Sequence, residues 1–187
     1  MRKLNKIVLG SILCCSLISL APMKIKAADS DEGTWIPYDY SYIYELKDGS
    51  RKEGWLLWND KWYYLGYDGI MKQNSTATIE GKKYCFKDNG EMASNEWFNV
   101  LGNSTSWLYC DNDGTCHIGW LYNGGNWYYF KESLPHCMSV GFETIGNRMY
   151  YFDSQSGVLQ IGTFTVNDTI YTTDSSGAII EKKDKDN

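Results

Sequence analysis

The chain has 187 residues, of which 16% are aromatic, 22% are charged and only three are proline. This composition excludes collagen-like and intrinsically disordered proteins. The formal net charge of −5 is unevenly distributed, because residues 1–27 carry cations but no acid and so leave the remainder more acidic than the whole. An acidic, ring-rich protein is a poor candidate for binding nucleic acid, which requires a basic surface.

The first 27 residues have the pattern of a secretory signal peptide. The basic segment MRKLNK precedes the apolar run IVLGSILCCSLISLAP, and Ala27 before Ala28 offers a small-residue cleavage site. An uncleaved membrane anchor is the alternative, but the apolar run is shorter than the roughly 20 residues that span a bilayer. We therefore expect a secreted protein, with no stable membrane span once residues 1–27 are removed.

The remainder of the chain repeats itself in steps of 20 to 23 residues. Each unit has a first, usually aromatic position, a second aromatic position that follows after seven residues in most units, and then a turn glycine. The first position is occupied by Trp35, Trp55, Thr76, Trp97, Trp120, Phe142 and Thr163. The second is occupied by Tyr42, Trp62, Lys83, Trp107, Trp127, Met149 and Ile170. A period maintained through seven units indicates a repeat architecture.

Each unit has the pattern of a β-hairpin. In the clearest copy, residues 54–65 form two short strands joined by a turn at Asn59-Asp60. Alternation places the neighbours Trp62 and Tyr63 on opposite faces of their strand, so both faces of the hairpin are apolar. A lone hairpin is marginal in water, but stacked hairpins cover each other's faces.

We therefore predict an all-β fold, a solenoid of about seven stacked β-hairpins with a repeat of about 21 residues. The array is expected to span residues 28–180, and residues 181–187 are expected to form a polar, disordered tail.

Four cysteines lie outside the predicted signal peptide: Cys85, Cys110, Cys116 and Cys137. An even number in a secreted chain predicts disulfide bonds, and three pairings are available. Cys110 and Cys116 flank a turn sequence at residues 111–115, which favours a bridge across one hairpin and leaves Cys85 to pair with Cys137.

A zinc site is the alternative use of these residues, because His117 adjoins Cys116 and His136 adjoins Cys137. The spacing matches no compact zinc pattern, and a secreted chain favours disulfides. We therefore expect no metal ion and no other cofactor.

Two units carry the repeat motif most clearly. They are Gly54-Trp55 followed by Trp62-Tyr63-Tyr64-Leu65, and Gly119-Trp120 followed by Trp127-Tyr128-Tyr129-Phe130. A Gly-x-Met signature follows two hairpins as Gly69-Ile70-Met71 and Gly90-Glu91-Met92. In these features residues 33–180 resemble the choline-binding, or cell-wall-binding, repeats of Gram-positive surface proteins and autolysins. Similar repeats bind glucans or host glycans in other proteins, so the resemblance is less specific about the ligand than about the fold.

The resemblance implies aromatic cages for a choline-like cation. In that family two aromatic residues of one hairpin and one of the next form three walls, and an apolar residue, often Met, closes the site. The implied sets are Trp55, Trp62 and Tyr84 with Met71; Trp97, Trp107 and Tyr128; Trp120, Trp127 and Tyr150 with Met138; and Trp35, Tyr42 and Tyr63. The units with Thr76 and Lys83, and with Thr163 and Ile170, cannot build a ring cage. Which tyrosine of each Tyr-Tyr pair forms the third wall stays open, because the two point to opposite faces.

The predicted function is attachment without catalysis. The expected partner is a choline-bearing, teichoic-acid-like polymer of the cell wall, which would place the protein at the cell surface. A carbohydrate-binding module for glucans or host glycans, and an adhesive or structural repeat protein, are the alternatives. The chain contains no phosphate-binding loop, metal-binding helix or serine-nucleophile motif, so we expect no enzymatic activity.

Overall fold

The computed structural model describes residues 33–99, 102, 106–133 and 135–185. The predicted signal peptide, residues 1–27, lies outside these residues. All regular structure in the described part of the chain is β-strand. The described residues contain no helix long and apolar enough to cross a membrane. The all-β prediction is confirmed.

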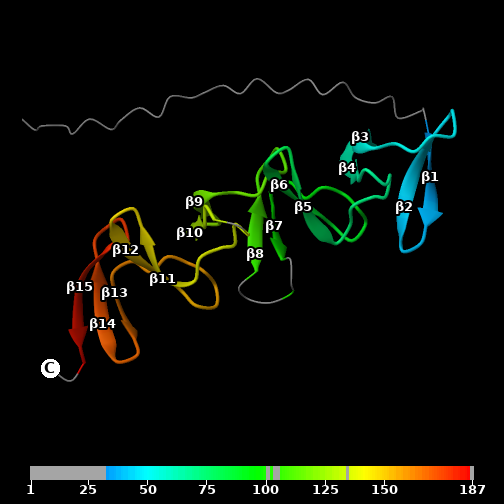
Figure 1. The fold of residues 1–187 in the computed structure, drawn as a ribbon. Helices are drawn as coiled ribbons and strands as arrows, with labels where there is room; N and C mark the ends of the chain where they lie inside the picture. The colour runs from blue at the N-terminus through cyan, green and yellow to red at the C-terminus, as the bar shows by residue number, and fades with distance from the viewer. Residues whose placement is uncertain (1–32, 100–101, 103–105, 134, 186–187) are drawn as a thin grey trace, which may run out of the picture.

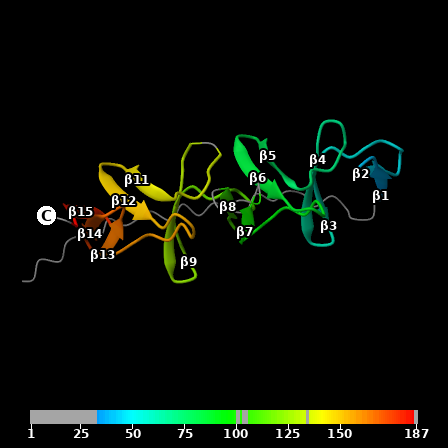
Figure 2. The ribbon, with the colours of Figure 1, turned by 90° about the horizontal axis from the view of Figure 1, so that it is seen from below.

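Fifteen strands, counted over the described residues, form six two-stranded hairpins and one three-stranded sheet. The strands are β1 (Gly33–Tyr38), β2 (Ser41–Leu46), β3 (Gly54–Trp58), β4 (Lys61–Leu65), β5 (Ser75–Ile79), β6 (Lys82–Phe86), β7 (Glu96–Asn99), β8 (Trp107–Cys110), β9 (Gly119–Asn123), β10 (Asn126–Phe130), β11 (Gly141–Ile145), β12 (Arg148–Phe152), β13 (Thr163–Val166), β14 (Thr169–Thr173) and β15 (Ile179–Asp184). The hairpins follow one another along an elongated molecule (Figure 1), and successive hairpins are turned relative to each other (Figure 2). This arrangement is the predicted row of seven hairpins.

The hairpin turns have the backbone that their sequence predicts. Asn59 and Asp60, between β3 and β4, have φ of 48° and 60°. Two consecutive residues in the left-handed region are the mark of a type I′ turn, whose twist matches that of the flanking strands. The turn sets the register, in which Trp58 lies opposite Lys61.

The hairpins bury both of their faces by stacking. On one face of β3–β4, Leu56 and Tyr63 are 1% and 7% exposed and share a cluster with Tyr44 of the preceding hairpin. On the opposite face, the Trp55 ring lies 6.0 Å from the ring of Phe86 in the following hairpin. Each hairpin is therefore part of two hydrophobic contacts, one with each neighbour, which a lone hairpin could not provide.

The linker that follows each hairpin reaches back to the hairpin before it. After β5–β6, the Met92 amide donates to the carbonyl of Trp62 in β4 over 2.7 Å. The same bond recurs from Met71 to Tyr42, from Cys116 to Lys83, from Met138 to Trp107 and from Leu159 to Trp127. We call each contact between consecutive hairpins a joint, and the donating residue of the linker its closing residue. In all five cases the acceptor is the residue at the second position of the repeat. An equivalent backbone bond therefore fixes the register at each of these five joints.

The prediction of a disordered tail over residues 181–187 is wrong for most of its length. Strand β15 pairs with β14 through Ile179–Asp184, with Lys182 opposite Tyr171. The side chains of this strand are largely exposed, which is why the segment has the composition of a solvated tail. The backbone nevertheless finds partners along the free edge of β14.

A turn glycine touches the closing residue of the joint before it. Gly90 has a φ of 82°, and a Cβ placed on it would overlap the Sδ and Cε atoms of Met71. Gly90→Ala therefore adds a clash inside a packed joint to the strain of a left-handed backbone. We expect Gly90→Ala to lower the free energy of unfolding by about 1–3 kcal/mol more than a glycine replacement in open space.

The matched control is Gly81→Ala, since Gly81 has a φ of 78° but no atom within 4 Å of such a Cβ. Urea denaturation of both variants measures the difference. Equal losses would mean that backbone strain alone determines the choice of glycine at position 90.

Candidate functional site

Three rings from two consecutive hairpins meet around Trp55. The Trp62 centroid lies 6.1 Å from that of Trp55 with an interplanar angle of 86°, and the Tyr84 centroid lies 4.8 Å away at 74°. Near-perpendicular rings form a corner rather than a stack, so their faces can line one space. We call this group the Trp55 cage. It contains the three ring residues that the sequence grouped there.

The same arrangement recurs around Trp97. Trp107 lies 6.4 Å from it at 83°, and Tyr128 lies 4.9 Å from it at 71°. The three rings border a pocket of about 350 Å³ whose other lining residues are Met138, Gln155 and Ser156. This Trp97 cage is an open aromatic pocket.

A third cage surrounds Trp120. Trp127 lies 6.3 Å from it at 85°, and Tyr150 lies 5.0 Å from it at 73°. Trp127 is 42% exposed, and the centroid of its ring lies 5.0 Å from that of Tyr122. A ligand in the Trp120 cage would thus meet a tryptophan that is accessible from solvent.

The fourth predicted set, around Trp35, contains a ring that the sequence did not assign. Tyr42 and Tyr63 lie 6.5 Å and 5.3 Å from Trp35. Trp58 also contacts Trp35, at 6.2 Å. The equivalent position is aromatic in the first unit, as Tyr38, but is Ile79, Asn123 and Ile145 in later units, so no steady periodic signal pointed to it.

The third wall is the first tyrosine of each Tyr-Tyr pair. Tyr63, Tyr128 and Tyr150 face the tryptophan of the preceding hairpin. The second tyrosine of a pair lies beside the tryptophan of its own hairpin, as Tyr64 does at 5.2 Å from Trp55. The structure therefore resolves an alternative that strand alternation alone left open.

The closing residues are one repeat away from where the sequence placed them. Met138 lines the Trp97 cage rather than the Trp120 cage, because its amide is bonded to Trp107. Met71 is bonded to Tyr42 and therefore belongs to the Trp35 set, not to the Trp55 cage. By the same bond, Met92 closes the Trp55 cage and Leu159 closes the Trp120 cage. The error arose because the linker reaches back by one hairpin, which spacing along the chain cannot reveal.

The hairpin β5–β6 departs from the pattern as predicted from its sequence. Thr76 lies opposite Cys85, and the Lys83 ammonium donates to the carbonyl of Pro135 over 2.8 Å. Neither residue supplies a ring. The hairpin β13–β14 likewise carries Thr163 and Ile170 at the two positions.

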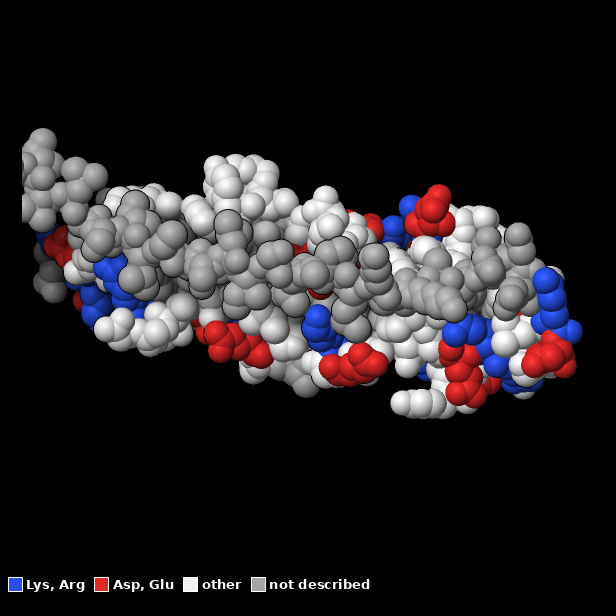
Figure 3. Space-filling view, turned by 90° about the horizontal axis from the view of Figure 1, so that it is seen from above, with Lys and Arg blue, Asp and Glu red and all other residues white. Residues whose placement is uncertain are grey.

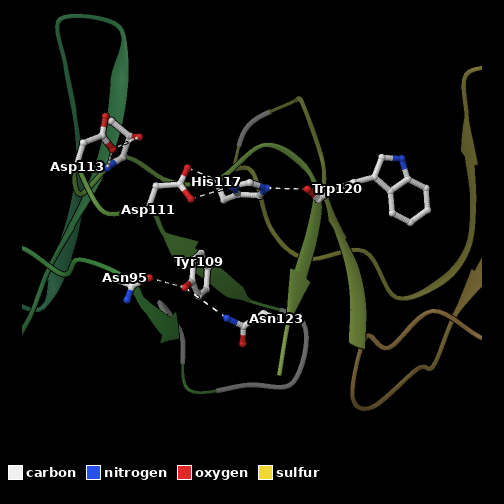
Figure 4. A network of polar contacts seen from close by, with 8 residues as sticks. Asn95, Tyr109, Asp111, Asp113, His117, Trp120 and Asn123 are labelled. Atoms are coloured by element: carbon white, nitrogen blue, oxygen red, sulfur yellow. Dashed lines mark hydrogen bonds and ion pairs between the residues drawn. The ribbon is translucent and has the colours of Figure 1, made fainter. Parts of the chain in front are cut away.

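Polar contacts connect two of the cage tryptophans to neighbouring residues, and those of Trp120 are drawn in Figure 4. The His117 ring donates through Nε2 to the Trp120 carbonyl over 3.1 Å, and its Nδ1 lies 2.9 Å from the Asp111 carboxylate. The indole N–H of Trp97 donates to the Asn123 side chain over 3.3 Å. His117 therefore connects the linker after β8 to the strand that carries Trp120.

Two of the third-wall phenols, Tyr63 and Tyr84, have a raised pKa. Burial raises the pKa of Tyr63, and nearby Glu91 adds to the effect. Burial also raises the pKa of Tyr84, with smaller contributions from Asp113 and Glu80. A neutral phenol keeps its ring available as an apolar wall.

Charge is mixed on the face shown in Figure 3. Acidic and basic side chains of the described residues alternate along its edges, and neither sign forms a continuous patch on that face.

Two regions of the chain match known families of repeats. Residues 52–97 match a family described as "Choline-binding repeat", and residues 118–133 match one described as "Putative cell wall binding repeat". The hairpins within residues 52–97 are therefore similar to choline-binding repeats, and β9–β10 is similar to a cell wall binding repeat. The two matched regions contain the Trp55 cage and the two tryptophans of the Trp120 cage.

Solved structures of choline-binding and cell wall proteins have a similar architecture. Choline binding protein F from Streptococcus pneumoniae is 33% identical, with a TM-score of 0.63, over 78% of this chain and 51% of that one. A cell wall endolysin from phage Cp-1, complexed with choline, is 28% identical with a TM-score of 0.52, over 69% of this chain and 37% of that one.

Among curated proteins, a putative endo-beta-N-acetylglucosaminidase of Streptococcus pneumoniae serotype 4 is 30% identical over 77 residues. The match covers 40% of this chain and 11% of that protein. The chain thus spans about half the length of choline binding protein F and a small part of the curated relative.

The cysteines depart from both predicted pairings. Cys85, Cys110, Cys116 and Cys137 are all free thiols. The Sγ atoms of Cys85 and Cys116 lie 3.5 Å apart, too far for a disulfide. The predicted pairs Cys110–Cys116 and Cys85–Cys137 are therefore not formed, and Cys85 lies instead beside Cys116.

Proposed function

We propose that the protein attaches to the bacterial cell surface by binding choline groups of wall polymers in its aromatic cages. The observation that carries this proposal is the Trp97 cage, an open pocket with two tryptophans and a tyrosine at near-right angles. Its ring composition matches the needs of a quaternary ammonium, which has no hydrogen-bond donor and is attracted to ring faces.

The expected affinity of one cage is low. A cation within about 6 Å of a ring centroid gains roughly 0.5–2 kcal/mol per ring, depending on desolvation. Three rings therefore supply several kcal/mol, and about 4 kcal/mol corresponds to a millimolar dissociation constant. Free choline at millimolar concentration should accordingly compete for the sites.

The proposal includes secretion and the absence of catalysis. The composition of residues 1–27 supports secretion. The described residues from Gly33 onward consist of repeats and their linkers, whereas the enzymes among the relatives share only a part of their length with this chain. We infer that the chain supplies attachment rather than hydrolysis.

A saccharide is the second candidate ligand, favoured by a separate groove. Trp55, Tyr64 and Tyr67 line a cavity of about 540 Å³ together with polar side chains that include Asp68 and Glu80. Aromatic faces beside carboxylates suit the apolar faces and hydroxyl groups of sugars. In this alternative Tyr67, which is 94% exposed, would be an outer stacking surface.

The two ligands are separated by elution from bacterial cell walls. We expect free choline to release the protein and neutral oligosaccharides to leave it bound. Trp127→Ala should reduce retention several-fold, because it removes one wall of the Trp120 cage, while Tyr67→Ala should leave retention unchanged. Release by oligosaccharide alone, with sensitivity to Tyr67→Ala but not to Trp127→Ala, would contradict choline binding and favour the groove.

A further inference from the structure

One joint of the array is built from cysteines instead of the usual core residues. Cys85 in β6 occupies the position of Tyr64 in β4, and Cys110 in β8 occupies the position of Leu65. Cys116 is the closing residue, a role that methionine fills at three other joints. Three positions that are aromatic or aliphatic elsewhere thus become thiols together, at a single place in the stack.

The same joint lacks a ring cage. Its hairpin carries Thr76 and Lys83 where four other hairpins carry two aromatic residues, and the Cys116 amide is bonded to the Lys83 carbonyl. The thiols therefore lie at the place in the repeat where a cage would otherwise close. Compared with the joints that have a cage, this joint therefore lacks the rings and has three sulfur atoms in their neighbourhood.

The three sulfur atoms converge. Every pair of Sγ atoms among Cys85, Cys110 and Cys116 lies within 4.8 Å, and the Cys85–Cys116 pair is 3.5 Å apart. Thiolates bound to one tetrahedral zinc ion at about 2.3 Å stand roughly 3.8 Å from each other. A small shift of side chains would bring the three sulfurs onto one ion.

Burial sets this group apart from surface thiols. Cys85 and Cys110 are fully buried, and Cys116 is 6% exposed. The cluster also includes Ala93 and Leu108, so its surroundings are apolar. A metal ion held here would be shielded from water on the side of the core.

We propose that Cys85, Cys110 and Cys116 form a three-thiolate binding site for a thiophilic metal ion, with Zn²⁺ as the probe of choice. Binding joins the three sulfurs to the ion and releases their three protons to solvent, so no oxidant or reductant is needed. Structural zinc stabilises the fold that holds it. The ion would thus fasten two hairpins at the joint where no aromatic cage forms.

Two further residues lie beside the three cysteines. Lys83 lies on the same strand face as Cys85, two residues away, and offers a positive charge beside three thiolates that outweigh the charge of a divalent ion. Cys137 is half-exposed and packs against the same cluster, but its sulfur lies outside the three-membered group. The fourth coordination position is therefore left to water or to another small ligand.

A disulfide is the competing use of these thiols. Cys110 and Cys116 face each other as a non-hydrogen-bonded antiparallel pair, flanked by bonds from His117 to Tyr109 and from Asp111 to Thr115. Such pairs bring Cα atoms to about 4.5 Å, within the range of a disulfide. One bridge would leave the third buried thiol without a partner, whereas a metal ion uses all three.

The test measures zinc bound to the full chain after reduction and refolding. The protein is refolded with a phosphine reductant and excess Zn²⁺, then desalted, and its zinc content is measured by mass spectrometry. We expect a single ion per chain, and cobalt in place of zinc should give the sulfur-to-metal charge-transfer absorption of thiolate coordination. Zinc should also keep the three thiols from forming disulfides in air.

Cys116→Met is the decisive variant, because Met71, Met92 and Met138 fill the same position at other joints. It keeps the joint packed and should abolish zinc binding and the cobalt absorption. Cys137→Ser is the matched control and should retain one ion. Denaturant unfolding confirms that both variants fold. Absence of zinc in the refolded wild type, or equal zinc in Cys116→Met and wild type, would overturn the proposal.

Discussion

Removing three of the four cages should weaken retention on a polymer that carries many choline groups by about 10²–10⁴-fold, while affinity of the remaining cage for free choline stays unchanged. The variant combines Tyr42→Ala, Trp62→Ala and Trp127→Ala, which each delete a second wall and leave the Trp97 cage intact. The reason is effective concentration: once one cage is occupied, binding at the next is intramolecular.

Surface plasmon resonance on choline-substituted polymer, with calorimetric titration of free choline, measures both quantities. The matched control replaces the exposed Tyr40 and Tyr67, which are 98% and 94% exposed, by alanine. If the triple variant held the polymer as tightly as the wild type, a single cage would be responsible for attachment and the multivalent mechanism would be wrong.

The second large effect concerns stability. Phe130 is fully buried between consecutive hairpins, with its ring 5.6 Å from both Trp97 and His117. Phe130→Ala removes the contact that the two hairpins share, and we expect it to lower the free energy of unfolding by about 3–5 kcal/mol. Because each hairpin contacts only its neighbours, hydrogen exchange should accelerate most at the joint between β7–β8 and β9–β10.

Phe164→Ala serves as the control for ring removal. Phe164 is only partly buried, and it stacks between Tyr151 and Tyr171 at 5.2 and 5.6 Å near the C-terminal end of the array. Its loss should cost less and should leave exchange at the Phe130 joint unchanged. Equal effects at both positions would mean that the array unfolds as one cooperative unit.

The hairpins could be predicted from the sequence because their determinants are local. The Asn59-Asp60 turn and the alternation of Trp62 and Tyr63 lie within twelve residues of chain. The ring sets followed from the resemblance to choline-binding repeats, carried over to the equivalent residues of consecutive units. Trp55, Trp62 and Tyr84 meet as that alignment implies.

The errors concern contacts that the repeat alone does not specify. Met138 was grouped with Trp120 because it follows Trp120 along the chain, but the linker carries it back to Trp107. The predicted cysteine pairs rest on the turn that Cys110 and Cys116 flank, whereas Cys85 and Cys116 meet across a joint. The segment 181–187 looked solvated because its side chains are polar, although the edge of β14 gives its backbone a partner.

Strand β15 has a consequence for how copies of this protein behave at high concentration. An open strand edge is a template on which another chain can pair, and charged side chains are a common protection against such association. β15 occupies the edge of β14 and presents Glu181, Lys182 and Lys183 to solvent. The array can thus expose many aromatic rings for binding and still remain protected, at this strand, against edge-to-edge growth into fibres.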